Sequence, residues 1–544
     1  MNPVQEKLAK QATWTRSEIL KYLALAICLL AMAVVSTMSL NAQCPGGAGN
    51  DNWTRPGGGD WSNGGNWSLG VPYQRFNACI PARTGMVTVK PTNVGTGIFA
   101  AKNLTILGGT TKLNLARPDR GNKKVELDLY GQTLTNQGGI QFLNAQGSTL
   151  SFKATNSDLS ITGGGFLYLE SPASSVNVGD GDVLTTDNTI FGRGNFGSPR
   201  AVLKNNGEFE ADISGATLQI YAGQRKGQKD PWGLENDGAM IAFGGSALKV
   251  SVSGSTVSVG NIITNGPDAQ MLLATGPPDD YFRNAGDISV RNGAPKKPST
   301  LTILTQKFDN TGSLDVGPFG TATIKGTVGS LAANSGTMNI ATNGTLTFQT
   351  DGFQQTAGTT TVNGLLAMEH GAFLSGTLKG SGTVKGNIIS TGATVKPGNS
   401  PGILTINGTY TQQGQGNFLV EIAGTAPGSG YGQLAVTENA SLGGTLSVGL
   451  LGGFTPTPTD FFTILTAGDG LGGYFGNAPP VIAPNIGDIT ADGYNFDVIY
   501  NWSGTGPGSV VLANFAPAPV PEPASFLLFG TGVLALRKVV RKRR

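Results

Sequence analysis

The sequence has few charged residues, a single histidine and only three cysteines. Charged side chains make up 13% of its 544 residues, against about 25% in an average soluble protein. Hydrophobic residues make up 39% and recur in alternation with polar ones, which argues against intrinsic disorder. Because metal centres need clusters of His, Cys, Asp or Glu, we expect no metal site, and no sequence motif indicates a cofactor.

The small basic excess lies at the two ends of the chain. Residues 1–42 hold four basic and two acidic residues, and residues 524–544 hold six basic residues and no acidic one. The body between them therefore has more acidic than basic residues, although the whole chain carries a formal charge of +3. A nucleic-acid-binding surface would need basic residues in the body, so we expect no nucleic-acid partner.

Glycine is the most informative abundant residue, with 83 of 544 positions, about twice the usual share of roughly 7%. Most of the remaining polarity comes from Thr, Ser, Asn and Gln. Glycine and the β-branched Thr and Val disfavour helices, whereas short strands joined by turns accommodate them well. The composition therefore predicts an all-β protein.

The N-terminus has the features of an export signal. An uncharged apolar run, Tyr22–Val35, follows Lys21 in a basic leader, as in a secretory signal peptide. We predict recognition by the secretion translocon and cleavage by signal peptidase after Ala42, or after Ser39. The leader is long, so an uncleaved membrane anchor is the alternative.

The C-terminus combines three features within 25 residues. Pro521-Glu522-Pro523 precedes the apolar segment Phe526–Leu536, and the chain ends in the basic residues Arg537, Lys538, Arg541, Lys542, Arg543 and Arg544. The prolines keep their segment extended, as a processing enzyme requires. The apolar segment is short for a membrane span, and its basic end would stay on the cytoplasmic side. Everything upstream would then lie outside the membrane.

This arrangement resembles the PEP-CTERM sorting domain. The resemblance implies recognition by an exosortase, a membrane cysteine protease, with Pro521, Glu522 and Pro523 as the recognition residues and cleavage near them. We therefore expect an intermediate anchored in the inner membrane by its tail, and then a product at the cell surface or in the extracellular matrix. An ordinary tail anchor is the alternative, but an anchor alone would not need Pro-Glu-Pro at this spacing.

The start of the mature chain contains two cysteines and several tryptophans. Cys28 lies in the signal, which leaves Cys44 and Cys79 as a plausible disulfide in an exported protein. Between them lie Trp53, Trp61 and Trp67. The segment is similar to the opening of exported β-solenoid proteins. Its indoles would cover the first coil as a cap, or alternatively stack on sugar rings; we favour the cap.

A short motif of an apolar residue, Asn and Gly recurs through the body. Gly286, Gly312, Gly336 and Gly358 are separated by 26, 24 and 22 residues, which is the coil length of a parallel β-solenoid. We expect glycine to supply a positive φ at each corner and asparagine to hydrogen-bond along the stack. Spacing before residue 280 is irregular and indicates loops there. A string of β-sandwiches is the alternative fold.

The region from about 371 to 466 is similar to the end of autotransporter passenger domains, on runs such as Gly380-Ser-Gly382-Thr-Val384 and Pro397-Gly-Asn-Ser-Pro-Gly402. The resemblance implies a right-handed parallel β-helix, here flanked by an N-terminal signal helix and a C-terminal hydrophobic helix. The predicted parts are a signal at 1–42, a cap at 43–110, a solenoid body at 111–370, a β-rich region at 371–515 and the sorting tail at 516–544.

No catalytic residue is predicted, because the sequence has no nucleophile motif and a lone His370 is weak support for chemistry. The alternative is a β-helix polysaccharide lyase or hydrolase, which needs converging acids and bases. Two clusters have such residues: Lys112, Arg117, Arg120, Lys123 and Lys124 near Glu126 and Asp128; and Arg225, Lys226, Lys229 and Asp230. Our leading hypothesis is a non-enzymatic, adhesin-like structural protein of the cell surface or biofilm matrix that contacts exopolysaccharide.

Overall fold

The computed structural model describes residues 44–517, except 57, 83–88, 91–97, 117–123, 226–231, 278–279, 400 and 503–505. These residues form two compact units: one reaches Gln354 and includes Gly364–Glu369, and the other comprises Gln355–Asn363 and the chain from His370. The two helices expected at the ends of the chain lie outside the described residues. The finer division at residues 110 and 370 stays a prediction.

The first unit is built from three stacks of parallel strands. The first stack holds β5 (Ile98–Ala101), β8 (Val125–Leu129), β11 (Ser148–Phe152), β14 (Ser175–Asn177), β17 (Gly194–Gly197), β20 (Thr217–Gly223), β23 (Ala247–Ser253), β26 (Gln270–Ala274), β29 (Ser299–Leu304), β32 (Gly320–Lys325), β35 (Thr345–Gln349) and the beginning of β38 (Leu365–Phe373). The second holds β1 (Asn50–Asn52), β3 (Asn77–Ile80), β6 (Leu104–Ile106), β9 (Thr133–Asn136), β12 (Asp158–Thr162), β15 (Val183–Thr186), β18 (Val202–Asn205), β21 (Trp232–Asn236), β24 (Ser255–Ser258), β27 (Tyr281–Asn284), β30 (Lys307–Asn310), β33 (Leu331–Asn334) and β36 (Gly352–Gln355). The third holds β7 (Lys112–Asn114), β10 (Gly139–Phe142), β13 (Phe166–Leu169), β16 (Thr189–Gly192), β19 (Glu208–Ala211), β22 (Ala239–Phe243), β25 (Asn261–Asn265), β28 (Asp287–Arg291), β31 (Ser313–Val316) and β34 (Thr337–Ile340).

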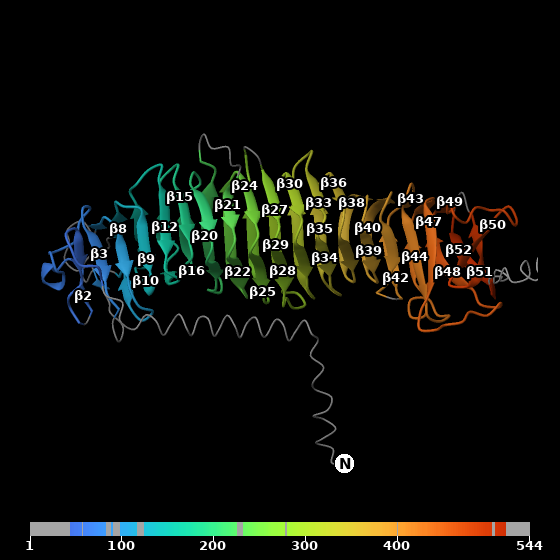
Figure 1. Ribbon diagram of the computed structural model, residues 1–544, viewed down its shortest axis with the longest axis horizontal. Helices are drawn as coiled ribbons and strands as arrows, with labels where there is room; N and C mark the ends of the chain where they lie inside the picture. Colours follow the sequence, from blue (N-terminus) through green and yellow to red (C-terminus); the bar gives the residue numbers. More distant parts are fainter. Residues whose placement is uncertain are drawn as a thin grey trace, which may run out of the picture. The chain divides into compact units, whose positions relative to one another are not determined.

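From β5 onward in this unit, each strand pairs with the strand three positions later, always in parallel. Three strands thus complete one coil, and the winding is that of a right-handed parallel β-helix. Figure 1 shows β22, β25 and β28 of successive coils side by side. This pairing confirms the predicted solenoid and excludes a string of β-sandwiches, whose sheets are antiparallel.

Coil length follows the repeat that the glycines predict. Asp287 pairs with Ser313 and Ser313 with Thr337, which are the separations of 26 and 24 residues read from the sequence. Earlier coils are uneven, because Thr189 pairs with Glu208 only 19 residues later, whereas Glu208 pairs with Ala239 after 31. The irregularity expected before residue 280 is therefore confirmed.

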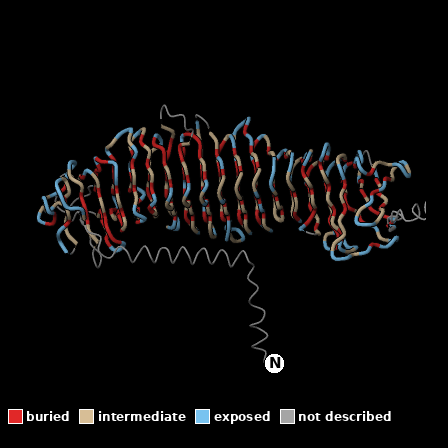
Figure 2. The backbone as a smooth tube through the Cα atoms, in the orientation of Figure 1, coloured by how far each residue is buried: buried red, intermediate tan, exposed pale blue. Residues whose placement is uncertain are grey.

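The core is a set of apolar files that run from coil to coil. In the first stack Leu248, Met271, Leu301, Ala322 and Leu346 are successive register partners, and all are buried. Side chains alternate between the two faces of a strand, so the residues between them point outward, and Figure 2 shows this alternation of buried and less buried positions along each coil. Each coil gains its core only by stacking on its neighbours.

The corner glycines are needed for a different reason from the one we predicted. Gly286, Gly312 and Gly336 do not have a positive φ, and only Gly358, at 70°, does. A Cβ atom at Gly312 would lie 2.1 Å from the carbonyl oxygen of Gly286, and one at Gly336 would lie 2.0 Å from that of Gly312. Glycine is thus required by the close approach of backbone from the preceding coil, and the expectation of a positive φ is wrong at the first three positions.

The asparagines form the expected ladder, and it lies inside the core. Asn284 Nδ2 donates to Asn310 Oδ1 at 2.7 Å, and Asn310 Nδ2 donates to Asn334 Oδ1 at 2.8 Å. Asn205 donates to Asn236 in the same way at 2.7 Å. All five side chains are fully buried, and the ladder pairs amide groups that would otherwise be costly in the core. Among the described residues, Asn284 Oδ1 has no hydrogen-bond partner.

The second unit also winds in parallel coils but ends in an antiparallel sheet. Its parallel strands are β37 (Thr359–Val362), β39 (Thr377–Gly380), β40 (Thr383–Ser390), β41 (Thr394–Pro397), β42 (Ile403–Asn407), β43 (Tyr410–Gln412), β44 (Asn417–Ile422), β45 (Gln433–Val436), β46 (Asn439–Leu442), β47 (Thr445–Leu450), β48 (Phe462–Ala467) and β49 (Gly470–Gly473). β52 (Gly508–Pro517) then pairs antiparallel with β48 and with β51 (Tyr494–Asn501), which pairs with β50 (Ile486–Ala491). The antiparallel strands cover the edge of β48 and stop the parallel stacking there.

Candidate functional site

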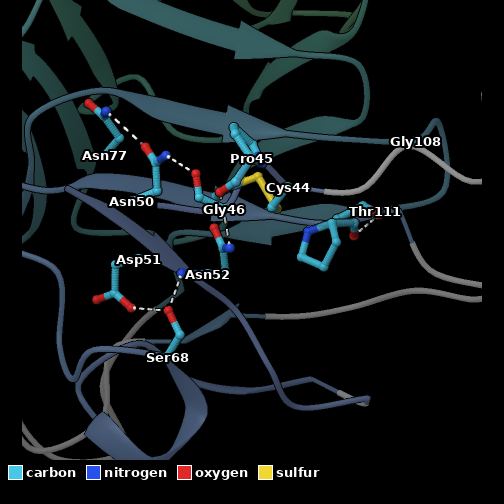
Figure 3. Close-up of a disulfide and its surroundings, with 12 residues drawn as sticks. Cys44, Pro45, Gly46, Asn50, Asp51, Asn52, Ser68, Asn77, Gly108 and Thr111 are labelled. Atoms are coloured by element: carbon cyan, nitrogen blue, oxygen red, sulfur yellow. Dashed lines mark hydrogen bonds between the residues drawn. A yellow bond between two sulfur atoms is a disulfide. The ribbon is translucent and has the colours of Figure 1, made fainter. Parts of the chain in front are cut away.

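A disulfide fastens the first described residues to the solenoid. Cys44 is bonded to Cys79, 35 residues away, and Cys79 lies in β3, which pairs with β1. Figure 3 shows the bond beside Asn50 and Asn52. Asp51 adds a second attachment, because its buried carboxylate accepts hydrogen bonds from the backbone N–H of Leu69 and from Ser68 Oγ. Burial raises the pKa of Asp51, although these hydrogen bonds oppose the rise.

The three tryptophans of this segment pack against one another. Trp53, Trp61 and Trp67 are only 1%, 2% and 4% exposed. The Trp67 ring lies 5.1 Å from that of Trp53 and 4.7 Å from that of Trp61, both edge to face, and its Nε1 donates to the carbonyl of Trp61. No ring face is free for a sugar, so the stacking alternative is wrong for these residues, and their burial is what a cap requires.

The first cluster considered for catalysis contains an ion pair that the sequence did not reveal. Glu126 and Asp128 project from the outward face of β8, and Lys153 of the next coil lies 3.1 Å from Glu126 Oε1 and 3.0 Å from Asp128 Oδ1. Burial raises the pKa of Asp128 to about 6, aided by the nearby Glu126. Burial also acts on Glu126, but hydrogen bonds from Lys153 and Asp128 outweigh it and lower its pKa.

This cluster can hold a proton near neutral pH, but little of it is open to a polymer. The side chain of Asp128 is 7% exposed and that of Glu126 is 31% exposed. A general acid must touch the oxygen that it protonates, which the buried Asp128 does not favour. Of the basic residues grouped with it, Lys112 contacts Phe166 instead, and Arg117, Arg120 and Lys123 lie outside the described residues.

The second proposed cluster is not assembled within the described residues. Arg225 lies 3.8 Å from Asp158 and donates to the carbonyl of Asn156, whereas Lys226, Lys229 and Asp230 lie outside the described residues. The single histidine, His370, is exposed in β38. Asp182 is buried and accepts hydrogen bonds from the backbone of Ser157 and Gly179, so its carboxylate holds a turn.

A surface that the sequence analysis missed lies on the outward face of the third stack. It consists of Phe166 and Tyr168 in β13, Phe191 in β16, and Glu208 and Glu210 in β19, and we call it the ring–carboxylate patch. Tyr168, Phe191 and Glu210 are successive register partners, as are Phe166, Thr189 and Glu208. Three adjacent coils therefore place three rings beside two carboxylates.

The rings of the patch touch one another and remain half-buried. The Phe191 ring lies 4.9 Å from that of Tyr168 and 5.6 Å from that of Phe166. Lys112 Nζ lies 5.7 Å from the Phe166 centroid. Gly139, the register partner of Phe166, leaves the space for this ring, since a Cβ there would lie 2.3 Å from Phe166 Cζ. Such outward rings offer a partly apolar, partly polar contact surface.

The carboxylates of the patch are destabilised in their charged form. Burial raises the pKa of Glu208. It also raises the pKa of Glu210, to which the negative charges of Glu208 and Asp212 contribute. Tyr168 has a raised pKa for similar reasons, burial first and then Glu170 and Asp212. Aromatic rings beside acids can stack on sugars and accept hydrogen bonds from their hydroxyl groups.

Comparison with protein families identifies the C-terminal end of the chain. Residues 519–544 match the PEP-CTERM protein-sorting motif, and no curated protein matches the chain. The matched segment contains Pro521, Glu522 and Pro523, the apolar run and the basic end, all outside the described residues. Within the part of the chain that is described, no helix is long and apolar enough to cross a membrane.

The motif implies processing by an exosortase, export, and sorting to the cell surface through a membrane-anchored intermediate. Its position after the last strand of the β-helix leaves the folded coils on the exported side of the predicted cleavage region. The chain is thus a β-helix protein that carries a PEP-CTERM sorting motif, as a substrate of an exosortase does.

Proposed function

We propose that the exported chain is a non-enzymatic structural protein of the cell surface or of the exopolysaccharide matrix, where its β-helix binds glycans. The sorting motif is the observation that carries this proposal, because it supports export of the coils and their sorting to the cell surface, where extracellular glycans can reach them. The ring–carboxylate patch supports glycan contact, since its rings face outward and touch in a row.

A solenoid suits a structural role in such a matrix. Each coil adds its own buried residues to the core and contacts only the neighbouring coils. Further coils can therefore be added without changing the packing of the earlier ones. Its outward positions are rich in threonine, as in β29, β32 and β35. Many modest hydrogen bonds to a polymer can sum to firm attachment even though each is weak.

Co-sedimentation with exopolysaccharide from the producing cells tests this proposal. The protein is recovered after export and processing, and a variant with Tyr168→Ala and Phe191→Ala is compared with it. We expect the two substitutions to weaken binding about tenfold, since each ring contributes about 0.5–1.5 kcal/mol to a stacking contact. As a matched control, Tyr130→Ala removes an exposed ring outside the patch and should leave binding unchanged.

One outcome would move the proposed glycan contact away from the patch, and another would contradict the non-enzymatic role. Equal binding by the protein and the double variant would remove the patch from the glycan contact. Shortening of the polymer during incubation would favour a polysaccharide lyase or hydrolase instead, and Asp128 would then be the first residue to substitute, because its pKa of about 6 suits a general acid.

A further inference from the structure

Glu208 and Glu210 differ from other glutamates on outward strand faces in what surrounds them. Glu126, Glu235 and Glu421 each have a lysine within 2.7–3.1 Å. For Glu208 and Glu210, no ion pair or hydrogen bond of the carboxylate is found among the described residues. Their charges are half-buried and close to each other and to Asp212, which is an arrangement that costs free energy until a cation or a donor approaches.

The rings next to these carboxylates would also favour a cation. Phe191 is the register partner of Glu210, so the two residues are neighbours on adjacent strands, whose backbones lie about 4.8 Å apart in the hydrogen-bonding direction. Lys112 already lies over the outer ring, Phe166. An ammonium group between Phe191 and Glu210 would contact an aromatic ring and a carboxylate at the same time.

We propose that the ring–carboxylate patch binds a polysaccharide whose sugars carry free amino groups. This inference rests on the proposed glycan-binding function and names the class of glycan. The sugar rings lie on Phe191 and Tyr168, and the ammonium groups lie between these rings and the carboxylates of Glu208 and Glu210. The bound amines supply the counter-charge for Glu208 and Glu210, whose carboxylates have no ion pair among the described residues. The cations nearest the patch act on its rings instead, since Lys112 lies over Phe166 and the charge of Arg193 acts on Tyr168.

Charge complementarity selects this class over other glycans. An acidic polysaccharide would be repelled by Glu208, Glu210 and Asp212, which already repel one another. A neutral polysaccharide would stack on the rings and donate hydroxyl hydrogen bonds, but it would leave the negative charges without a counter-charge. Free amines provide both the hydrogen bonds and the counter-charge.

The test compares glucosamine oligosaccharides with their N-acetylated counterparts of the same length by titration calorimetry at about pH 6. The processed full-length product should bind the free-amine form at least about tenfold more tightly, and added salt should narrow the gap because it screens exposed charges. Glu208→Gln with Glu210→Gln should bring the two affinities together and leave binding of the N-acetylated form in place. Unchanged circular dichroism and thermal unfolding would verify that this variant is folded.

The same stack provides a matched control. Asp287 and Asp315 occupy the same two outward files as Glu208 and Glu210 on later coils. They accept hydrogen bonds from Ser313 and from Asn339, and serine, not an aromatic ring, lies beside them in register. Asp287→Asn with Asp315→Asn removes the same charge from the same sheet and should not change the preference for the free amine.

The outcomes separate this inference from the function on which it rests. Equal affinity for the two forms, or a preference that survives Glu208→Gln with Glu210→Gln, would overturn the choice of amino sugars while glycan binding remains. If neither form binds and no other glycan binds, both proposals fail. If oligolysine binds as tightly and Phe191→Ala has no effect on the amino sugar, simple charge attraction replaces the glycan site.

Discussion

Individual carboxylates in this chain depend on their neighbours for their charge, and Asp128 illustrates the consequence for stability. Its folded-state pKa of about 6 lies above the ordinary 3.8, so the stability due to its protonated form is present at low pH and is lost as the pH rises through about 6. Glu126 behaves in the opposite way, since its lowered pKa stabilises the fold at higher pH. Substituting Asp128 alone isolates the first effect.

We expect the stability of Asp128→Asn to increase, relative to that of the wild type, as the pH rises from about 4.5 to 7.5. The gain in the free energy of unfolding should be about 1–3 kcal/mol across this range, because the amide never has to ionise in its buried position. Urea unfolding at several pH values measures the difference. A constant difference across the range would show that Lys153 fully compensates the charge.

Within one coil, the corner glycines limit what the stack can accept. Gly312→Ala would place a Cβ about 2 Å from the carbonyl oxygen of Gly286, so neighbouring coils would have to separate, at a cost of about 1–3 kcal/mol. Gly109→Ala, whose nearest contact would be at 4.0 Å, is the matched control. Thermal unfolding of both variants tests this, and equal midpoints would contradict the role of close backbone approach.

The strands and coil lengths could be predicted from the sequence, but the contacts between outward residues could not. The Asn-x-Gly spacing predicted the repeat because backbone crowding recurs at Gly286, Gly312 and Gly336. The buried ladder recurs with it and links Asn284, Asn310 and Asn334. Lys153 and Glu126 meet only because of a register set by uneven coils. Similarly, alternation places Phe166 and Tyr168 on one face of β13 but does not say which face is the core, and large apolar rings would suit either.

The N-terminal segment with the disulfide and the buried tryptophans packs at the first coils, where the predicted cap would cover the end of the stack. We expect Cys44→Ser to lower the stability of the first coils by about 3–4 kcal/mol, because the bond closes a loop of 35 residues. Hydrogen exchange followed by mass spectrometry should show faster exchange in β1 and β3, whereas β28 and β31 should not change. Uniform loss of protection along the unit would mean instead that the coils unfold as one cooperative body.

For the molecule as a whole, the fold and the sorting motif give different information about function. The parallel β-helix by itself fits enzymes and structural proteins alike. The motif supplies the destination. Function therefore could be predicted from the sequence to the level of export and surface sorting, because that information lies in a short linear segment and does not depend on folding.

Mass spectrometry of the protein recovered from the surface of the producing cells tests the sorting by an exosortase most directly. We predict a chain that lacks the basic end, Arg537–Arg544, with its new C-terminus near Pro521–Pro523. The same measurement on a variant with Pro521, Glu522 and Pro523 replaced by alanine should find the basic end retained in the membrane fraction. Recovery of the unsubstituted chain from the cytosol, with its basic end intact, would contradict export and sorting together.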